Sequence, residues 1–148
     1  MRYYRLRPYL YRLYEEQTVR IRNEKLSEAL KLLPVPVKHP FFKIDSVNVS
    51  ASANYAWDGA TGALLQTEDL MVPSLIHDIG CQAINLGLLP HEYRPMFDRE
   101  YLLQCEAYKV WPWRRQMHYL AIRMWGLIPK KEESVAKYAR VYFFKVLE

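Results

Sequence analysis

The sequence predicts an α+β domain in which antiparallel strands come first, a three-helix segment follows, and a strand ends the chain. Short segments with β-branched and aromatic residues mark strands in the first third, and apolar residues recur at helical spacing from Asp69 to about Trp125. The stretch Tyr138–Leu147 is again typical of a strand. Because strands and helices are segregated along the chain, an antiparallel sheet is favoured over an alternating parallel one.

The length of 148 residues, half of them hydrophobic, predicts a single domain over residues 1–148. We divide it into a strand-rich part at 1–54, a loop at 55–68, a helical part at 69–126 and a C-terminal strand region at 127–148. A loop as long as 55–68 is usually functional when it occurs in a compact domain. The sequence therefore predicts that this loop contributes to a site.

Turn residues divide the strand-rich part into short elements. The predicted strands cover residues 9–14, 18–21, 41–44 and 47–50. Lys25–Leu33 has a spacing that suits either a short helix or a loop. The prolines at 34, 36 and 40 exclude any helix between that segment and Phe41.

The helical part is predicted to hold three helices. The first begins at Asp69, capped by Thr67 or Asp69, and ends at Gly87. The second covers about Arg94–Val110 and the third about Trp113–Trp125. In the third helix, the residues predicted to point inward are Met117, Leu120, Ala121 and Met124.

Charge and composition restrict the function classes. The net charge is +5, yet the chain has no run of five like charges, so a dedicated nucleic-acid surface is not the favoured interpretation. Twelve Tyr and four Trp suit interfaces as well as a core. Cys81 and Cys105 lack metal-ligand spacing and are predicted to be buried free thiols. With no apolar stretch long enough to span a membrane and no hydrophobic leader, a cytoplasmic protein is expected.

Three places along the chain carry candidate site residues. Asp58 lies on the predicted loop between Trp57 and Gly59. His77 and Asp78 are neighbours on the first helix, so their side chains diverge by about 100°. Asp98 lies in the first turn of the second helix, four residues after Arg94, and an antiparallel helix pair would bring it near His77.

This set has two interpretations. As a functional site it predicts a base oriented by a carboxylate, or carboxylates around a divalent metal ion. The predicted roles are catalytic for His77 and Asp78, metal-binding for Asp58, Asp78 and Asp98, and binding for Trp57, Gly59 and Arg94. As plain structure, the carboxylates cap a turn or a helix, His77 is a core histidine, and Arg94–Asp98 is an i,i+4 pair.

The same residues carry a family resemblance. The segments Asn54-Tyr-Ala-Trp-Asp-Gly-Ala-Thr-Gly62, Ser74-Leu-Ile-His-Asp78 and Arg94-Pro-Met-Phe-Asp98 resemble the domain-of-unknown-function 1353 family of phage and prophage proteins. The resemblance extends over about residues 9–126, with Arg114, Tyr119, Ile122, Arg123 and Gly126 in register with its last segment. The family's tyrosine after His-Asp is missing here, Phe97 stands in place of its alanine, and Ala63 in place of its proline.

The resemblance implies a phage context without an established activity. The first hypothesis is a virion-associated or assembly component, at a tail or head-completion position, that contacts other phage structural proteins in a multi-copy assembly. The alternative is a metal-dependent hydrolase acting on a lipid or cell-wall substrate. His-Asp on a helix beside a glycine-containing loop resembles secreted phospholipases A2, in which the histidine is the base and the aspartate a calcium ligand. A host-directed inhibitor is a third interpretation.

Overall fold

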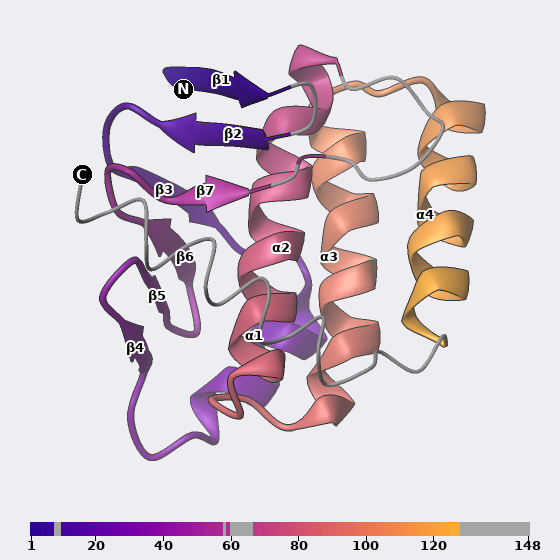
Figure 1. The fold of residues 1–148 in the computed structure, drawn as a ribbon. Coiled ribbons are helices and arrows are strands. Elements are labelled where there is room, and N and C mark those ends of the chain that lie inside the picture. The colour runs from indigo at the N-terminus through magenta and orange to yellow at the C-terminus, as the bar shows by residue number, and fades with distance from the viewer. Residues whose placement is uncertain (8–9, 58, 60–66, 128–148) are drawn as a thin grey trace.

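The computed structural model describes residues 1–7, 10–57, 59 and 67–127 of the chain (Figure 1). Short antiparallel strands form one side of the molecule, and the helices α2, α3 and α4 follow one another on the other side. The predicted α+β class and the order of strands before helices are confirmed. The predicted C-terminal strand at Tyr138–Leu147 lies outside the described residues.

The strands form two small antiparallel sheets. The first has the order β1–β2–β7, with β1 at Tyr3–Arg7, β2 at Leu10–Leu13 and β7 at Ala56–Trp57. The second has the order β3–β6–β5–β4, with β3 at Gln17–Arg20, β6 at Asn48–Ala51, β5 at Phe42–Ile44 and β4 at Val37–His39. Strands β2, β3, β5 and β6 fall on the predicted segments. Strand β7 was not predicted, because it is only two residues long and lies within the segment expected to be an irregular loop.

The segment after β3 forms helix α1, Glu24–Lys31, so the helical option is the one adopted. Asn23 caps this helix, since its Oδ1 accepts the Lys25 N–H at 3.1 Å. The apolar spacing of the segment buries Leu26 and Leu30 against the rest of the core.

The three later helices are α2 (Met71–Asn85), α3 (Arg94–Ala107) and α4 (Pro112–Gly126). A 3-10 turn, η1 at Glu68–Leu70, precedes α2, and η2 at His91–Tyr93 precedes α3. The prediction that Thr67 or Asp69 caps the long helix is wrong, because the two side chains bond each other within η1, before the helix begins. The chain leaves α2 at Gly87, whose φ of +71° is left-handed as the predicted end requires.

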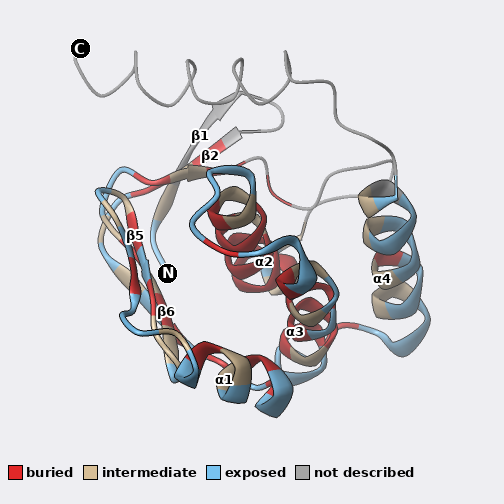
Figure 2. Cartoon of the chain, turned by 90° about the horizontal axis from the view of Figure 1, so that it is seen from below, coloured by how far each residue is buried: buried red, intermediate tan, exposed pale blue. Residues whose placement is uncertain are grey.

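Helix α2 lies at the centre of the molecule, between the strands and α3, and is buried on nearly all sides (Figure 2). Its apolar side chains join those of both sheets in one core that includes Trp57, Phe42 and Ile76. Helix α3 approaches α2 closely at Gly80, where a Cβ atom would collide with the Phe97 ring. Glycine at this position therefore allows the two helices to pack side by side.

Helix α4 packs with the opposite face from the one that its apolar pattern predicts. Met117, Leu120 and Met124 are exposed, as is Ala121, so the prediction that these residues point inward is wrong. The inward face instead presents His118, which is buried, and Ile122, which packs beside Tyr101 and Cys105. A hydrogen bond between Tyr101 and His118 joins this inward face to α3, and a pattern of apolar residues alone cannot reveal it.

Candidate functional site

The centre of the candidate site is a buried pair formed by His77 of α2 and Asp98 of α3. The two helices run antiparallel and side by side (Figure 1), and they place His77 Nε2 2.8 Å from Asp98 Oδ1. The side chains of both residues are more than nine-tenths buried. Hydrogen bonds between ionisable groups in such surroundings are stronger than the same bonds in water.

Two arginines hold the carboxylate of Asp98 in place. Arg94 Nε donates to Asp98 Oδ1 at 3.0 Å from one helical turn away, and Arg123 Nη1 of α4 lies 3.5 Å from Oδ2. Burial alone would raise the pKa of Asp98, but the hydrogen bonds and charges of His77 and Arg94 outweigh it and lower that pKa. Asp98 therefore remains ionised at neutral pH.

The ionised carboxylate determines which nitrogen of His77 carries a proton. A carboxylate only accepts hydrogen bonds, so Nε2 must donate. The other nitrogen, Nδ1, lies on the side of Asp78, 3.9 Å from Asp78 Oδ1. Burial opposes a charge on the ring, but Cys81, Asp78 and Asp98 together raise the pKa of His77 well above its usual value.

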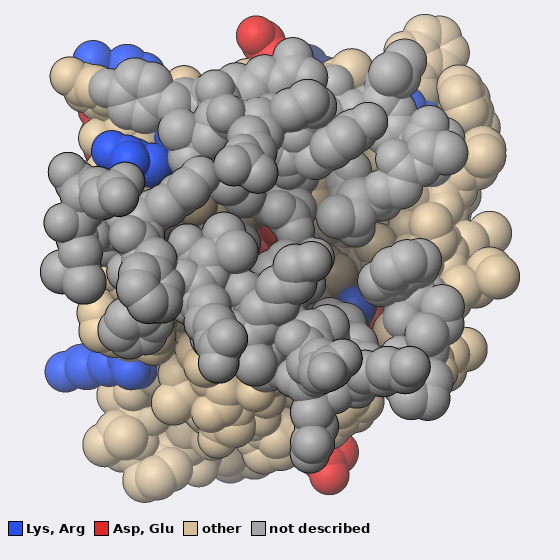
Figure 3. Space-filling model, viewed as in Figure 1, with Lys and Arg blue, Asp and Glu red and all other residues tan. Residues whose placement is uncertain are grey.

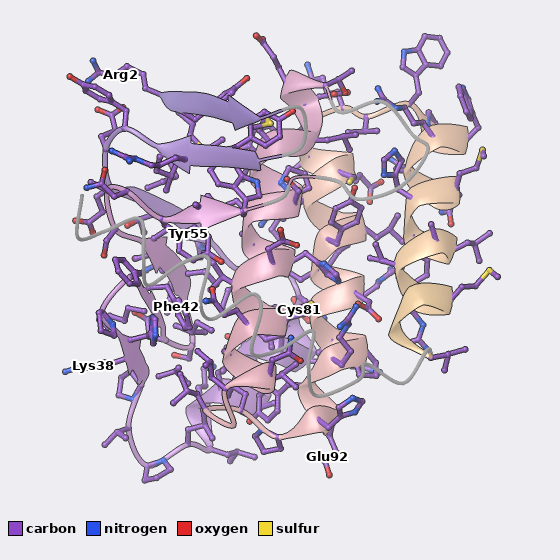
Figure 4. All side chains as sticks on the ribbon, in the orientation of Figure 1. Arg2, Lys38, Phe42, Tyr55, Cys81 and Glu92 are labelled. Carbon is purple, nitrogen blue, oxygen red and sulfur yellow. The ribbon has the colours of Figure 1, made fainter. Side chains whose placement is uncertain are left out.

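Cys81 lies one turn after His77 on α2, between that helix and α3 (Figure 4). Its Sγ is 3.7 Å from Nδ1 and 3.8 Å from Nε2. Because a lone pair of one nitrogen points away from the other, a sulfur nearly equidistant from both is not in line with either. This geometry does not align the thiol to pass its proton to His77 as an activated nucleophile would.

Asp78 is the member of this group that reaches solvent, with 29% of its side chain exposed. In the described part of the chain, no three His, Cys, Asp or Glu side chains are grouped so that they would hold a metal ion. Both oxygens of Asp98 already face cationic partners. Of the predicted metal ligands that the structure describes, Asp78 is therefore the one whose carboxylate could still bind an ion. Asp58, the third predicted ligand, lies outside the described residues.

Trp57 bonds helix α2 near the beginning of the predicted loop, and Gly59 lies buried two residues later. Trp57 is fully buried, and its Nε1 donates to Ser74 Oγ at 3.1 Å, one turn before His77. Gly59 is buried with a φ of +79°, a backbone conformation that favours glycine. Burial and the bond to Ser74 fix Trp57 against helix α2, and its predicted binding role stays a prediction. Ser74 was not predicted as a site residue, although it begins the Ser74–Asp78 segment that carries the family resemblance.

A second polar pair lies next to the first. The edge of the Tyr101 ring packs against His77, with 5.6 Å between ring centroids, and Tyr101 Oη bonds His118 Nδ1 at 3.1 Å. Burial and the charge of Arg114 lower the pKa of His118. Within the described residues, His118 Nε2 is buried and has no hydrogen-bond partner. His118 was not among the predicted residues, because it lies on the opposite face of a helix whose apolar pattern pointed the other way.

Comparison of the chain with protein-family models, with curated proteins and with solved structures finds no match to any of them. In the described ranges, no helix combines the length and the apolar character that crossing a membrane requires.

Proposed function

We propose that the chain is a hydrolase in which His77 is the general base that activates water against an ester or amide bond of a lipid or cell-wall substrate. The observation that carries this proposal is the 2.8 Å bond from His77 Nε2 to Asp98 Oδ1. A histidine oriented by a buried carboxylate is the arrangement that general-base catalysis uses on many unrelated folds.

The residues around His77 suit this role. Asp98 holds the ring in the tautomer that leaves a lone pair on Nδ1, on the side where Asp78 reaches solvent. When Nδ1 takes a proton from water, the imidazolium lies between Asp98 and Asp78, and both carboxylates stabilise its charge. General-base catalysis of this kind contributes about 10²–10⁴-fold to a rate.

The raised pKa of His77 sets the pH range of such an enzyme. The base form predominates only above that pKa, so activity is expected to increase with pH through and beyond neutrality. Asp78 has a carboxylate available for a divalent cation, and Asp58 is the other carboxylate proposed to hold one. A bound cation would polarise the bond under attack.

The decisive experiment compares two histidine variants of the full chain. His77→Gln should lose most of the hydrolysis of phospholipid vesicles or of purified cell wall, because no base remains. His118→Gln, which removes a buried histidine from the neighbouring pair, should retain it. Circular dichroism verifies that both variants fold. Equal activities of two folded variants, or no hydrolysis by the wild type of either substrate, would overturn the proposal.

Two further variants separate the parts of the mechanism. Cys81→Ser should remain active if water is the nucleophile, whereas loss of activity would assign attack to the thiol. Asp78→Asn should lower metal-independent activity, because one of the two carboxylates that stabilise the imidazolium is lost, and should abolish any further increase produced by added calcium or magnesium. Metal analysis of the purified wild type identifies any ion that remains bound.

A second candidate is the virion-associated or assembly component, in contact with other phage structural proteins. The specific observation in its favour is the exposed apolar surface of α4, including Trp113, Leu120 and Met124. Exposed apolar surface of this extent is typical of protein–protein contact sites. Mass spectrometry of purified virions of the encoding phage tests it, and absence of the protein from those virions would reject it.

A further inference from the structure

The outer face of α4 carries a continuous row of large apolar side chains. This row, here called the α4 stripe, consists of Trp113, Met117, Leu120, Met124 and Leu127, with exposed fractions between 47% and 81%. Trp111, just before the helix, is 70% exposed at the same end. The surface over α4 at the right of Figure 3 is accordingly neither acidic nor basic.

The spacing of the α4 stripe is that of a seam between helices. Its members follow one another at intervals of four, three, four and three residues, which keeps them within a narrow arc of the helix. A narrow arc of this kind is the pattern by which one helix packs along another. The opposite arc of α4, with His118 and Ile122, is already occupied by α3.

The charges around the α4 stripe indicate which partner fits. Helix α4 contains three arginines and no acidic residue, but all three arginines are engaged within the molecule. Arg114 pairs with Asp69, Arg115 with Glu106 and Arg123 with Asp98. An anionic lipid surface or an acidic partner would require basic side chains directed outward around the stripe. Within the described helix α4, the basic side chains are all paired inside the molecule, so an apolar, uncharged partner fits the stripe better.

We infer that the α4 stripe binds the α4 stripe of a second copy of this chain, with the two helices antiparallel about a two-fold axis near Leu120. Gln116 and Arg123 lie on the same edge of the stripe, on either side of Leu120. Antiparallel copies bring the same edges together, so Arg123 of one copy lies near Gln116 of the other and no like charges meet. Such a self-complementary contact is the usual form of a two-fold dimer.

The size of the surface is adequate for this contact. A specific interface buries about 800 Å² on each partner, and a large aromatic side chain can contribute about 150–250 Å² of that area. The α4 stripe with Trp111 provides two tryptophans, two methionines and two leucines, each roughly half exposed or more. The association does not depend on the hydrolytic proposal, and it would supply the contact between copies in a multi-copy assembly.

The test measures the mass of the full chain in solution by sedimentation over a wide range of concentration. The wild type is expected to dimerise, and Leu120→Glu should weaken the association by at least about tenfold, since a charge would be buried in the seam. The matched control is Leu32→Glu, which places the same charge at an exposed leucine after α1 and should leave the dimer intact. Circular dichroism verifies that both variants fold.

Cross-linking tests the direction of the helices. Chains with Met117→Cys and Met124→Cys, mixed and mildly oxidised, should form the mixed disulfide in preference to either like pair. Preference for the like pairs would overturn the antiparallel arrangement.

Several results would overturn the inference as a whole. One is a wild type that is monomeric throughout, and another is a dimer that Leu120→Glu does not weaken. A monomer that sediments with phosphatidylglycerol vesicles only while Leu120 is intact would make lipid the partner. A monomer that Leu120→Glu strongly destabilises would show that another part of the same chain covers the stripe.

Discussion

Helix α3 buries two carboxylates only two residues apart, and the two are stabilised in opposite ways. Asp98 is 1% exposed and faces α2 and α4, where its partners are an imidazole and two guanidinium groups. Glu100 is fully buried on another face of the helix, where its partners are neutral amides. One carboxylate therefore orients a histidine that can change its charge, whereas the other holds the fold together.

The partners of Glu100 come from the connection between β3 and α1. Its carboxylate accepts the backbone N–H of Arg22 at 3.1 Å and of Asn23 at 2.7 Å, and Gln104 Nε2 donates to it at 2.6 Å. Gln104 Nε2 also donates to the carbonyl of Arg20. These bonds attach the first part of the chain to α3. None of the three donors can exchange a proton near neutral pH, so we assign Glu100 a structural role.

The largest expected effect on stability comes from replacing Glu100, the structural carboxylate. Glu100→Ala leaves the backbone N–H groups of Arg22 and of the buried Asn23 without their acceptor and should lower the free energy of unfolding by about 2–4 kcal/mol. Urea denaturation measures this loss. Glu100→Gln retains the shape and one acceptor oxygen and should lose less. Equal losses for the two variants would show that side-chain volume, rather than acceptance of the amides, is what matters.

The next effect is on the catalytic side. Asp98→Asn removes the negative charge that His77 and the two arginines share, so the pKa of His77 should fall towards its ordinary value. Loss of charged hydrogen bonds should also lower the free energy of unfolding by about 1.5–3 kcal/mol. Titration of the His77 ring by NMR measures the pKa. Glu100→Gln is the control and should leave that pKa unchanged, and a similar shift in both variants would contradict the separation of the two faces.

The comparison also predicts how stability changes with pH. Because folding raises the pKa of His77, its contribution is complete below the unfolded pKa of about 6.5 and is lost as pH rises through the folded pKa. Folding lowers the pKa of Asp98, so its contribution is present above about 3.9 and is lost as pH falls through the folded pKa.

Thermal unfolding at a series of pH values measures how the stability changes with pH in both ranges. The difference between the wild type and His77→Gln isolates His77 from His118, whose lowered pKa acts in the opposite direction. That difference should shrink as pH rises above about 6.5. A difference that is constant with pH would mean that His77 does not change charge on folding.

The smallest effect on stability is expected from Arg123, the more exposed of the two arginines that face Asp98. Arg123 Nη1 lies 3.5 Å from Oδ2, and the arginine side chain is 44% exposed, so solvent screens the pair. Arg123→Gln should change the free energy of unfolding by about 0.2–1 kcal/mol, measured by urea denaturation. Arg94→Gln is the matched variant at 3.0 Å and should have the larger effect, because Arg94 is mostly buried. A reversed order would assign the stabilisation of Asp98 to α4.

Local patterns predicted the parts of this molecule that local chemistry determines. Strands β2, β3, β5 and β6, the helix ending at Gly87 and the proximity of His77 to Asp98 follow from turn residues, helical spacing and the short connection between two helices, whereas β1, β4 and β7 were not predicted. Partners distant in sequence were not predictable. Glu100 accepts hydrogen bonds from Arg22 and Asn23, which precede it by 78 and 77 positions in the sequence, and nothing near Glu100 in the chain indicates this. The face by which α4 packs depends on Tyr101 and His118, and the apolar pattern indicated the other face.

The contact at Gly80 couples the spacing of two helices to the length of one hydrogen bond. A methyl group at that position would push Phe97, and α3 with it, away from α2. Asp98 follows Phe97 directly, so the same displacement would pull its carboxylate from His77. The absence of a side chain at Gly80 thus helps to set the distance between His77 and Asp98. Engineers who redesign the core around Phe97 will alter the acidity of His77 even where every ionisable group is left in place.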